Sequence, residues 1–190
     1  LKAVELMNTI LPSGVLNVIT GGPEAGKKLV AHPKIKKVAF TGSVESGRQV
    51  YKSAAEKIIP VTLELGGKSP FIIFDDVDVD QVVESAYQGM RFSRQGQSCS
   101  AASRLFVHES IHDVFVEKLI ALLDTKIMGD PMKEETEIGS LISKRQYDKV
   151  QGFIKLAEND ASLKMRQGAK LPTDEHLKAG LFLRPTLITG

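Results

Sequence analysis

The sequence is poor in the features that mark secreted, membrane-bound or nucleic-acid-binding proteins. It contains one cysteine, Cys99, which excludes an internal disulfide framework and agrees with a reducing compartment. No apolar run reaches the ~18–20 residues that a membrane span requires, and residues 1–6 lack the basic, apolar and small-residue order of a secretion signal. The nearest approach to a basic run, residues 34–37, has no aromatic side chains beside it. We therefore expect a cytoplasmic protein that binds neither nucleic acid nor membrane.

The sequence also gives no indication of a metal site or a repeat architecture. It has 4 histidines, and only His108 and His112 have the spacing of two ligands on one helix face. No third ligand, such as a nearby carboxylate or a cysteine motif, completes a recognisable site. We expect no bound metal and place the histidines at the surface or on helix flanks. No internal repeat or low-complexity segment is found.

What is present is the composition of a folded globular chain. Hydrophobic residues make up 42% and charged residues 25% of the 190 residues, with a net charge of +2, so a sizeable core can form. This length suits one large domain or two smaller lobes. The sequence opens on Leu1 without a methionine and stops at Gly190 directly after an apolar segment. We therefore expect both ends to lie inside a longer protein.

Strands alternate with helices in the first 66 residues. The predicted elements are the end of a helix over 4–11, a strand at 15–19, a helix over 24–31, a strand at 37–40, a helix over 44–55 that Ser43 caps, and a strand at 61–65. This order predicts a parallel sheet that helices cover on both faces.

Gly66 and Gly67 interrupt the alternation, and we place the boundary between two lobes there, at 1–66 and 67–190. The elements predicted beyond it are a strand at 71–74, a helix over about 80–92, a strand at 105–107, an amphipathic helix over about 110–128, a helix over about 143–159 and a loop-rich stretch at 167–181. The second lobe is therefore also α/β.

Cys99 is the first candidate for a catalytic residue. Its neighbours at 98 and 100–102 are serines and alanines, so no bulky side chain blocks a small electrophile from its sulfur. The thiolate is the reacting form, and helix N-termini or cations favour it. Arg94 and Arg104 are near in sequence. A buried, inert cysteine also fits this segment taken alone.

Glu64 is the second candidate for a catalytic residue, because it interrupts the apolar strand at 61–65. The alternation places Glu64 and Thr62 on one face of that strand, which also fits a solvated face. In the centre of a covered parallel sheet the carboxylate would be buried, and burial would bring its proton affinity toward the range that suits a general base. At the carboxyl end of the strand, Glu64 would face the crevice where α/β sheets bind ligands.

Two glycine turns are candidates for phosphate binding. Residues 40–47, with the sequence Phe-Thr-Gly-Ser-Val-Glu-Ser-Gly, predict a strand, a turn and a helix start. The free N–H groups and positive dipole end of such a helix suit a phosphate. The spacing is not the three-glycine dinucleotide fingerprint. The turn at 21–26 fits either a phosphate site or tight packing.

Three motifs in order resemble the NAD(P)-dependent aldehyde dehydrogenase family. They are Phe-Thr-Gly-Ser at 40–43, Leu-Glu-Leu-Gly-Gly-Lys-Ser-Pro at 63–70 and Gly-Gln-Ser-Cys at 96–99, and the likeness extends over essentially the whole chain. The resemblance implies that residues 1–66 are the later half of a Rossmann-like, parallel-sheet NAD(P)-binding domain. It implies that residues 67–190 are the earlier half of an α/β catalytic domain.

The resemblance also implies roles for individual residues. Cys99 matches the nucleophile that attacks the aldehyde, and its N–H matches one oxyanion donor. Glu64 matches the base that activates water to hydrolyse the thioester. The cofactor is NAD or NADP, and the residues that match its site are Gly42, Ser43, Val44, Glu45, Ser46 and Gly47 at the pyrophosphate and Leu65 near the nicotinamide. The substrate is a small-molecule aldehyde.

Some family features lie outside these 190 residues. An asparagine oxyanion donor and a ribose-contacting lysine belong upstream of Leu1, and a further glutamate and phenylalanine at the cofactor belong downstream of Gly190. Within the chain, Ser93-Arg94 stands where an asparagine and a small or polar residue are common, and the turn at 21–26 is one residue shorter than usual. We expect a homo-oligomer for the complete protein and negligible turnover from this piece alone.

Two other functions are open at this point. A catalytically silent relative, or an inactive fragment, would keep the scaffold for structure or binding. An enzyme that passes the acyl group to coenzyme A would not need a water-activating base, so Glu64 argues for hydrolysis.

Overall fold

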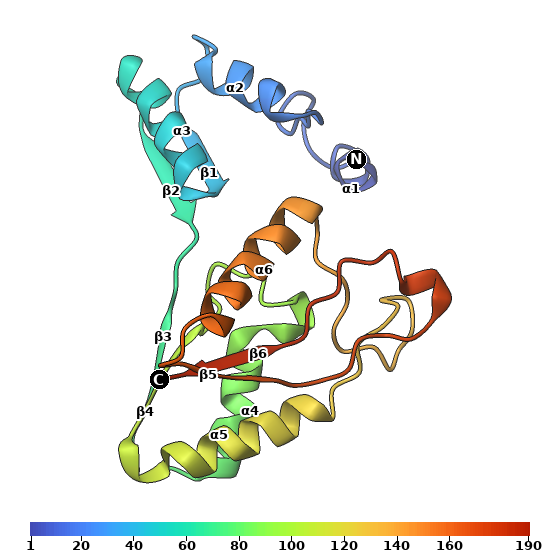
Figure 1. The fold of residues 1–190 in the computed structure, drawn as a ribbon. Helices are drawn as coiled ribbons and strands as arrows, with labels where there is room; N and C mark the ends of the chain where they lie inside the picture. The colour runs from blue at the N-terminus through green and yellow to red at the C-terminus, as the bar shows by residue number, and fades with distance from the viewer. The chain divides into compact units, whose positions relative to one another are not determined.

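Three two-stranded sheets and the helices packed on them form the chain, which a computed structural model describes over residues 1–190 (Figure 1). The chain divides into two compact units, Leu1–Gly66 and Gly67–Gly190, and each is described by itself. The helices are α1 (Lys2–Met7), α2 (Pro23–Ala31), α3 (Val44–Glu56), α4 (Val79–Met90), α5 (Glu109–Asp124) and α6 (Lys144–Glu158), with short 3-10 helices η1 (Phe92–Arg94) and η2 (Glu175–Leu177). The strands are β1 (Val38–Gly42), β2 (Val61–Leu65), β3 (Pro70–Ile73), β4 (Arg104–Val107), β5 (Lys164–Gln167) and β6 (Thr186–Thr189).

In the first unit, β1 and β2 pair in parallel from Val38–Val61 to Gly42–Leu65. Helix α3 contacts both strands and α2 contacts α3 (Figure 1). Ser43 begins α3 as predicted, because its hydroxyl accepts the Ser46 N–H at 3.1 Å. The predicted strands at 37–40 and 61–65 and the helix at 44–55 are confirmed within two residues.

The strand predicted at 15–19 is wrong. A strand needs a ladder partner, and in this unit β1 and β2 pair only with each other. Side-chain bonds hold local turns in the segment instead, from Asn17 to the Gly14 carbonyl (2.9 Å) and from Asn8 to the Leu16 carbonyl (3.1 Å). The preceding helix α1 ends at Met7, earlier than predicted.

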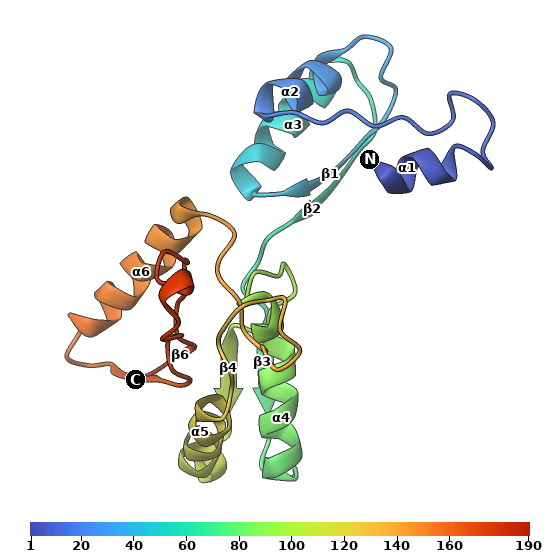
Figure 2. The same cartoon turned by 90° about the vertical axis from the view of Figure 1, so that its right-hand side faces the viewer.

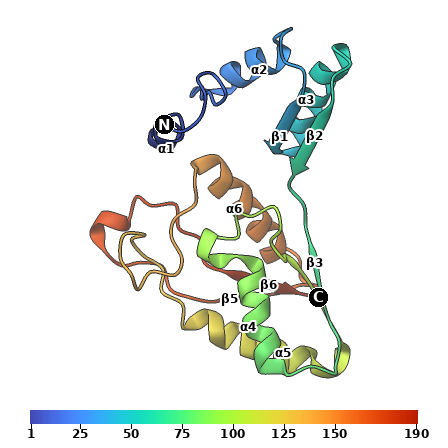
Figure 3. The same ribbon diagram turned by 180° about the vertical axis from the view of Figure 1, so that it is seen from behind.

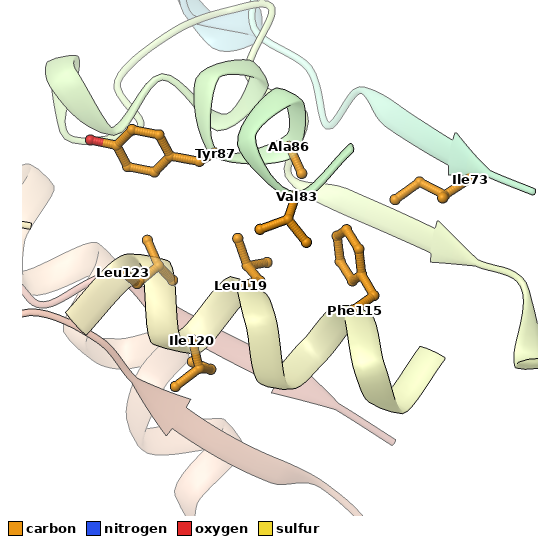
Figure 4. Packing of buried hydrophobic residues seen from close by; sticks show 8 residues of the cluster. All are labelled: Ile73, Val83, Ala86, Tyr87, Phe115, Leu119, Ile120 and Leu123. Atoms are coloured by element: carbon orange, nitrogen blue, oxygen red, sulfur yellow. The ribbon is translucent and has the colours of Figure 1, made fainter. Parts of the chain in front are cut away.

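In the second unit, β3 and β4 pair in parallel from Pro70–Arg104 to Ile73–Val107, beside helices α4 and α5 (Figure 2). The main core of the unit lies between these elements. Figure 4 shows residues of α5 pointing toward α4, while Ile120 points toward the β5–β6 pair. The buried members of this cluster are Ile73, Val83, Ala86, Tyr87, Phe115, Leu119, Ile120 and Leu123.

The antiparallel pair of β5 and β6 was not predicted. Its register runs from Lys164–Thr189 to Gln167–Thr186, and α6 contacts β5 (Figure 3). Both strands are only four residues long, and three of the four residues of β5 are polar or charged, which hides the alternation of a half-buried strand.

Helix α5 ends at Asp124, short of the predicted end at 128. The backbone beyond it finds partners outside the helix, because the Ile127 carbonyl accepts the N–H groups of Glu137 (2.9 Å) and Ile138 (3.1 Å). Met128 forms a bridge with Ile138. No helix in the structure combines the length and the hydrophobicity that a membrane crossing requires.

Candidate active site

Cys99 lies on the loop between η1 and β4 and is exposed. The Ala101 N–H donates to the Ser98 carbonyl at 3.3 Å, so Cys99 and Ser100 are the central residues of a turn. The small neighbours predicted to leave the sulfur open are in place, and the alternative of a buried cysteine is wrong. The thiol is therefore accessible to a small electrophile.

The backbone amide of Cys99 is also available. The amides of Ser98, Ser100 and Ala101 all donate within the turn, at 2.9 Å to the Gly96 carbonyl, 3.4 Å to the Ser98 hydroxyl and 3.3 Å to the Ser98 carbonyl. The structure records no hydrogen bond from the Cys99 N–H. A free N–H beside a nucleophile can receive the oxyanion that forms when the nucleophile attacks a carbonyl.

The cations near Cys99 in sequence are engaged in different ways. The Arg104 guanidinium donates to the Lys68 carbonyl at 2.8 Å and lies 5.7 Å from the Phe106 ring centroid, so it secures the start of β4 and not the thiol. Arg94 ends η1 at the beginning of the loop. The segment at Gly67 lies against the loop, because a Cβ at Gly67 would be 4.0 Å from the Cys99 carbonyl oxygen.

Glu64 lies near the carboxyl end of β2, in the first unit, and is exposed. Of the two alternatives for this side chain, the solvated face is found and the buried carboxylate is wrong. Only β1 pairs with β2, and Thr62 and Glu64 form the exposed face of the strand while Leu63 and Leu65 are half-buried. Exposure keeps this carboxylate in contact with water, the molecule that a general base would activate.

The turn after β1 presents the positive end of α3. Ser43 supplies its hydroxyl to the Ser46 N–H and its carbonyl to the Gly47 N–H, at 3.1 and 2.8 Å. The structure records no acceptor for the N–H groups of Val44 and Glu45. These two free donors at the end of a 13-residue helix suit an anion, and Arg48 neutralises the Glu45 carboxylate at 2.9 Å.

Gly47 lets the end of β2 approach α3 closely. A Cβ at Gly47 would lie 2.6 Å from Leu65 Cδ2, a distance that real side chains do not tolerate. Gly42 is similarly close to its own strand, since a Cβ there would lie 2.6 Å from Phe40 Cζ. The first unit thus brings the predicted pyrophosphate residues, Gly42 to Gly47, together with Leu65.

A groove of about 600 Å³ lies between α2 and α3. Ser46, in the first turn of α3, lies in its wall and directly follows Val44 and Glu45, which carry the free N–H groups. Sequence reasoning missed this feature, and its signal was the apolar residues on the facing sides of the two helices. Its lining residues are Pro23, Gly26, Lys27, Val30, Ala31, Phe40, Ser46, Gln49, Val50 and Ser53.

The apolar groove and the free N–H groups fit a dinucleotide, which carries a flat base and a pyrophosphate. The earlier turn at 21–26 starts α2, with Gly22 as its N-cap. A Cβ at Gly21 would lie 2.9 Å from the Ala25 Cβ, which accords with tight packing there.

The groups with shifted pKa values in the second unit include Tyr87 on α4 and Lys126 and Glu137 beyond α5. Burial raises the pKa of Tyr87, whose ring lies 4.4 Å from Lys126 Nζ. Burial alone would lower the pKa of Lys126, but its hydrogen bond to Glu137 raises it. No group of three or more potential metal ligands is found. His108 is exposed and His112 is half-buried, and His108 caps α5 by accepting the Ser110 N–H.

Comparison with known proteins supplies the family. The protein-family model described as "Aldehyde dehydrogenase family" matches residues 1–190 of the sequence. The chain is 49% identical over 187 residues to chloroplastic betaine aldehyde dehydrogenase of Beta vulgaris, which covers 97% of this chain and 37% of that protein. It is 44% identical over 180 residues to peroxisomal aminoaldehyde dehydrogenase 2 of Pisum sativum, covering 94% of this chain and 35% of that protein.

A solved structure is similar over almost the whole chain. It is betaine aldehyde dehydrogenase of Staphylococcus aureus in complex with NAD⁺, with 36% identity and a TM-score of 0.89 over 98% of this chain and 37% of that one. This likeness confirms the predicted α/β fold class with a Rossmann-like parallel sheet. The chain spans little more than a third of the length of these relatives. Two of them are named for the chloroplast or the peroxisome, so the cytoplasmic location stays a prediction. The chain belongs to the aldehyde dehydrogenase family.

Proposed function

We propose that the complete protein oxidises an aldehyde to a carboxylic acid with NAD or NADP, through a covalent intermediate on Cys99. The observation that carries the proposal is the exposed thiol on a turn whose own N–H has no acceptor. In this proposal, residues 1–66 are the later half of the cofactor domain and residues 67–190 the earlier half of the catalytic domain.

Cys99 supplies the nucleophile. Its thiolate adds to the aldehyde carbon, forming a C–S bond and moving the carbonyl electron pair onto oxygen, where the Cys99 N–H donates to it. NAD or NADP, when bound, accepts the hydride that leaves that carbon. The product on Cys99 is a thioester. The exposure of the sulfur supports this role because the substrate needs direct access to it.

Glu64 supplies the base for the second half of the reaction. Its carboxylate takes a proton from water, whose oxygen attacks the thioester carbon. The C–S bond then breaks, Cys99 returns to the thiolate and the carboxylic acid leaves. The exposed position of Glu64 at the end of β2 supports contact with water.

The first unit supplies the cofactor site. The free N–H groups of Val44 and Glu45 and the hydroxyls of Ser43 and Ser46 would hold the pyrophosphate, and the groove between α2 and α3 would take the flat base. Leu65, packed beside Gly47, would lie near the nicotinamide.

The substrate class that we propose is a betaine aldehyde or an aminoaldehyde. The names of the relatives from Beta vulgaris and Pisum sativum support it. Betaine aldehyde and a short aminoaldehyde should then have a higher kcat/KM than a neutral aldehyde of the same length.

The test measures NADH or NADPH formation by the complete gene product with these aldehydes. The parent should turn over, and Cys99→Ala should form no product above background. Glu64→Gln should still form about one equivalent of reduced cofactor rapidly and then turn over about 100-fold more slowly, because the thioester accumulates.

Three results would contradict the proposal. Activity that survives iodoacetamide labelling of Cys99 would exclude the covalent step. A protein that binds the cofactor but oxidises no aldehyde would support a catalytically silent relative. Acceleration by coenzyme A in place of water, with an unchanged rate in Glu64→Gln, would favour acyl transfer.

A further inference from the structure

The loop that carries Cys99 has little regular structure of its own. It leaves α4 through two non-glycine residues in the left-handed region, Arg91 (φ 60°) and Gln95 (φ 54°), followed by Gly96 (φ 67°). From Gln95 to Ser103 no strand or helix supports the backbone. The position of Cys99 therefore depends on hydrogen bonds made by individual residues.

Gln97 makes the bond that connects this loop to a distant part of the unit. Its side-chain oxygen accepts the Ile142 N–H at 3.1 Å, across 45 positions of sequence. Its side-chain nitrogen donates to the Arg94 carbonyl at 3.3 Å, and its backbone N–H donates to the same carbonyl at 2.9 Å. Both ends of the amide are thus used two residues before the thiol.

The segment that receives the bond is itself fixed. Ile138 is 1% exposed and belongs to the buried cluster with Met128 and Phe182. The Leu141 N–H donates to the Leu181 carbonyl at 2.9 Å. The side chain of Ile142 is 83% exposed, so packing of that side chain does not hold the junction. The Gln97 side-chain oxygen connects the Ile142 backbone to the loop.

The far side of the loop has its own anchor. The Ala102 N–H donates to the Gly89 carbonyl at 3.0 Å, and the Arg104 N–H donates to the Ser69 carbonyl at 3.3 Å. Cys99 therefore lies between a backbone anchor at residue 102 and a side-chain anchor at residue 97. Only the side-chain anchor can be removed by substitution without changing the backbone.

We infer that Gln97 is a positioning residue that sets where the Cys99 thiol and N–H lie, through its bond to the Ile142 N–H. The inference rests on the proposed function, in which the thiol attacks a carbonyl and the N–H binds the resulting oxyanion. Both groups act only at short range and in a fixed direction, so a displacement of about 1 Å can cost up to about 100-fold in rate.

The test compares three variants of the complete protein. Gln97→Met keeps the length of the side chain and removes both polar ends, and Gln97→Glu keeps an oxygen for the Ile142 N–H. The control is Gln151→Met, which removes another half-buried glutamine of the same unit, one that donates to the Tyr147 hydroxyl at 3.1 Å.

We expect Gln97→Met to lower kcat by about 10- to 100-fold, with the KM for the cofactor unchanged within about 2-fold. The rate of Cys99 alkylation by iodoacetamide, read on the Cys99 peptide by mass spectrometry, should change at least about 3-fold. Gln97→Glu should recover part of both values, since it keeps the acceptor for the Ile142 N–H but loses the donor to the Arg94 carbonyl, and Gln151→Met should match the parent in both.

Hydrogen exchange at the Ile142 amide provides a measurement that needs no variant. In the parent this amide should exchange at least about 10-fold more slowly than an unprotected amide, although its side chain is exposed. Exchange at the unprotected rate would overturn the inference, even if Gln97→Met fails to fold.

Other results would also overturn it. These are a kcat in Gln97→Met within about 2-fold of the parent, an unchanged alkylation rate, or an equal loss in Gln151→Met. Failure of the proposed function is distinguishable, because it would appear as aldehyde oxidation that persists in Cys99→Ala, whereas the amide exchange and the alkylation rate report on the Gln97 bond without turnover.

Discussion

The two units of the chain hold their functional groups in different ways. In the first unit, the turn at Gly42 is fixed by Ser43, whose partners Ser46 and Gly47 are three and four positions away. In the second, the Cys99 loop depends on the Gln97–Ile142 bond across 45 positions. The proposed pyrophosphate site is thus a local structure, and the proposed nucleophile depends on the tertiary structure around it.

The two units also differ in how many of their residues are buried. The first has few buried residues, Val38 in β1 and Gly47, Val50 and Ala54 in α3. The second has an apolar cluster between α4, α5 and the β3–β4 pair. Stability in the second unit should therefore respond strongly to the loss of long-range contacts, while the first should respond mainly to helix ends and turns.

Arg184 gives the largest expected effect on stability. Its guanidinium donates to the carbonyls of Gln167 (2.7 Å), Ala169 (2.9 Å) and Gly168 (3.3 Å), joining the segment before β6 to the end of β5 and the two residues after it. Arg184→Lys keeps the charge but loses the planar fork, so carbonyls lose their partner. We expect a loss of about 2–3 kcal/mol in the free energy of unfolding, measured with urea.

The matched control is Arg145→Lys on α6, an exposed arginine without a recorded side-chain bond, which should change stability by less than about 0.5 kcal/mol. If Arg184→Lys behaves like this control, the second unit does not depend on its long-range hydrogen bonds as the comparison states.

The same contrast explains what the sequence could predict. Ser43 as a helix cap, the strand at 61–65 and the helix near 143–159 carry their signals within a few residues, and all are found. Ser143 caps α6 as Ser43 caps α3, since its hydroxyl accepts the Gln146 N–H. Local hydrogen bonding and periodicity suffice for such elements.

Features that need a distant partner could not be predicted. β5 forms by pairing with β6, in a ladder that ends at Gln167 and Thr186. No pattern within residues 164–167 predicts a strand. The segment 15–19 has the composition of a strand but no partner. The burial expected for Glu64 required neighbours on both faces of β2, and only β1 pairs with it. The proposed roles of Cys99 and Glu64 rest on residue type and motif order, which do not depend on burial.

Ile58 tests the local character of the first unit, with a smaller expected effect. It follows α3 in the left-handed region (φ 53°) and is 93% exposed. The N–H groups of Ile58 and Ile59 donate to the carbonyls of Ala55 (3.0 Å) and Ala54 (3.2 Å), a Schellman motif in which glycine is usual. A β-branched residue is strained there.

Ile58→Gly should therefore stabilise the end of α3 by about 1 kcal/mol, seen as about 5-fold slower hydrogen exchange of the α3 amides. Ile58→Ala removes the same exposed side chain but keeps a Cβ in the left-handed region, so it should gain much less. Equal gains in the two variants would assign the effect to the lost apolar surface and not to the backbone.

The ion pair of Lys126 and Glu137 gives the smallest expected effect on stability, and this effect depends on pH. Lys126 Nζ lies 2.9 Å from one Glu137 oxygen, and the other accepts the Ile127 N–H at 3.1 Å. Burial alone would raise the pKa of Glu137, but these hydrogen bonds outweigh it and hold the pKa below its usual value of 4.5. A carboxyl with a lowered pKa contributes stability above that value and loses it as pH falls through the folded pKa.

Glu137→Gln should therefore cost about 0.5–1 kcal/mol at neutral pH, a modest value because the Glu137 side chain is 38% exposed. The difference from the parent should shrink as pH falls below 4.5. It should also shrink above 10.5, because the raised pKa of Lys126 contributes stability only until that group loses its proton. The control is Glu135→Gln, at an exposed position without a recorded bond. Its free energy of unfolding in urea should differ from that of the parent by the same small amount at every pH. A difference that persists unchanged at acid pH would mean that packing of residues 126–138, and not charge, joins this segment to the core of the second unit.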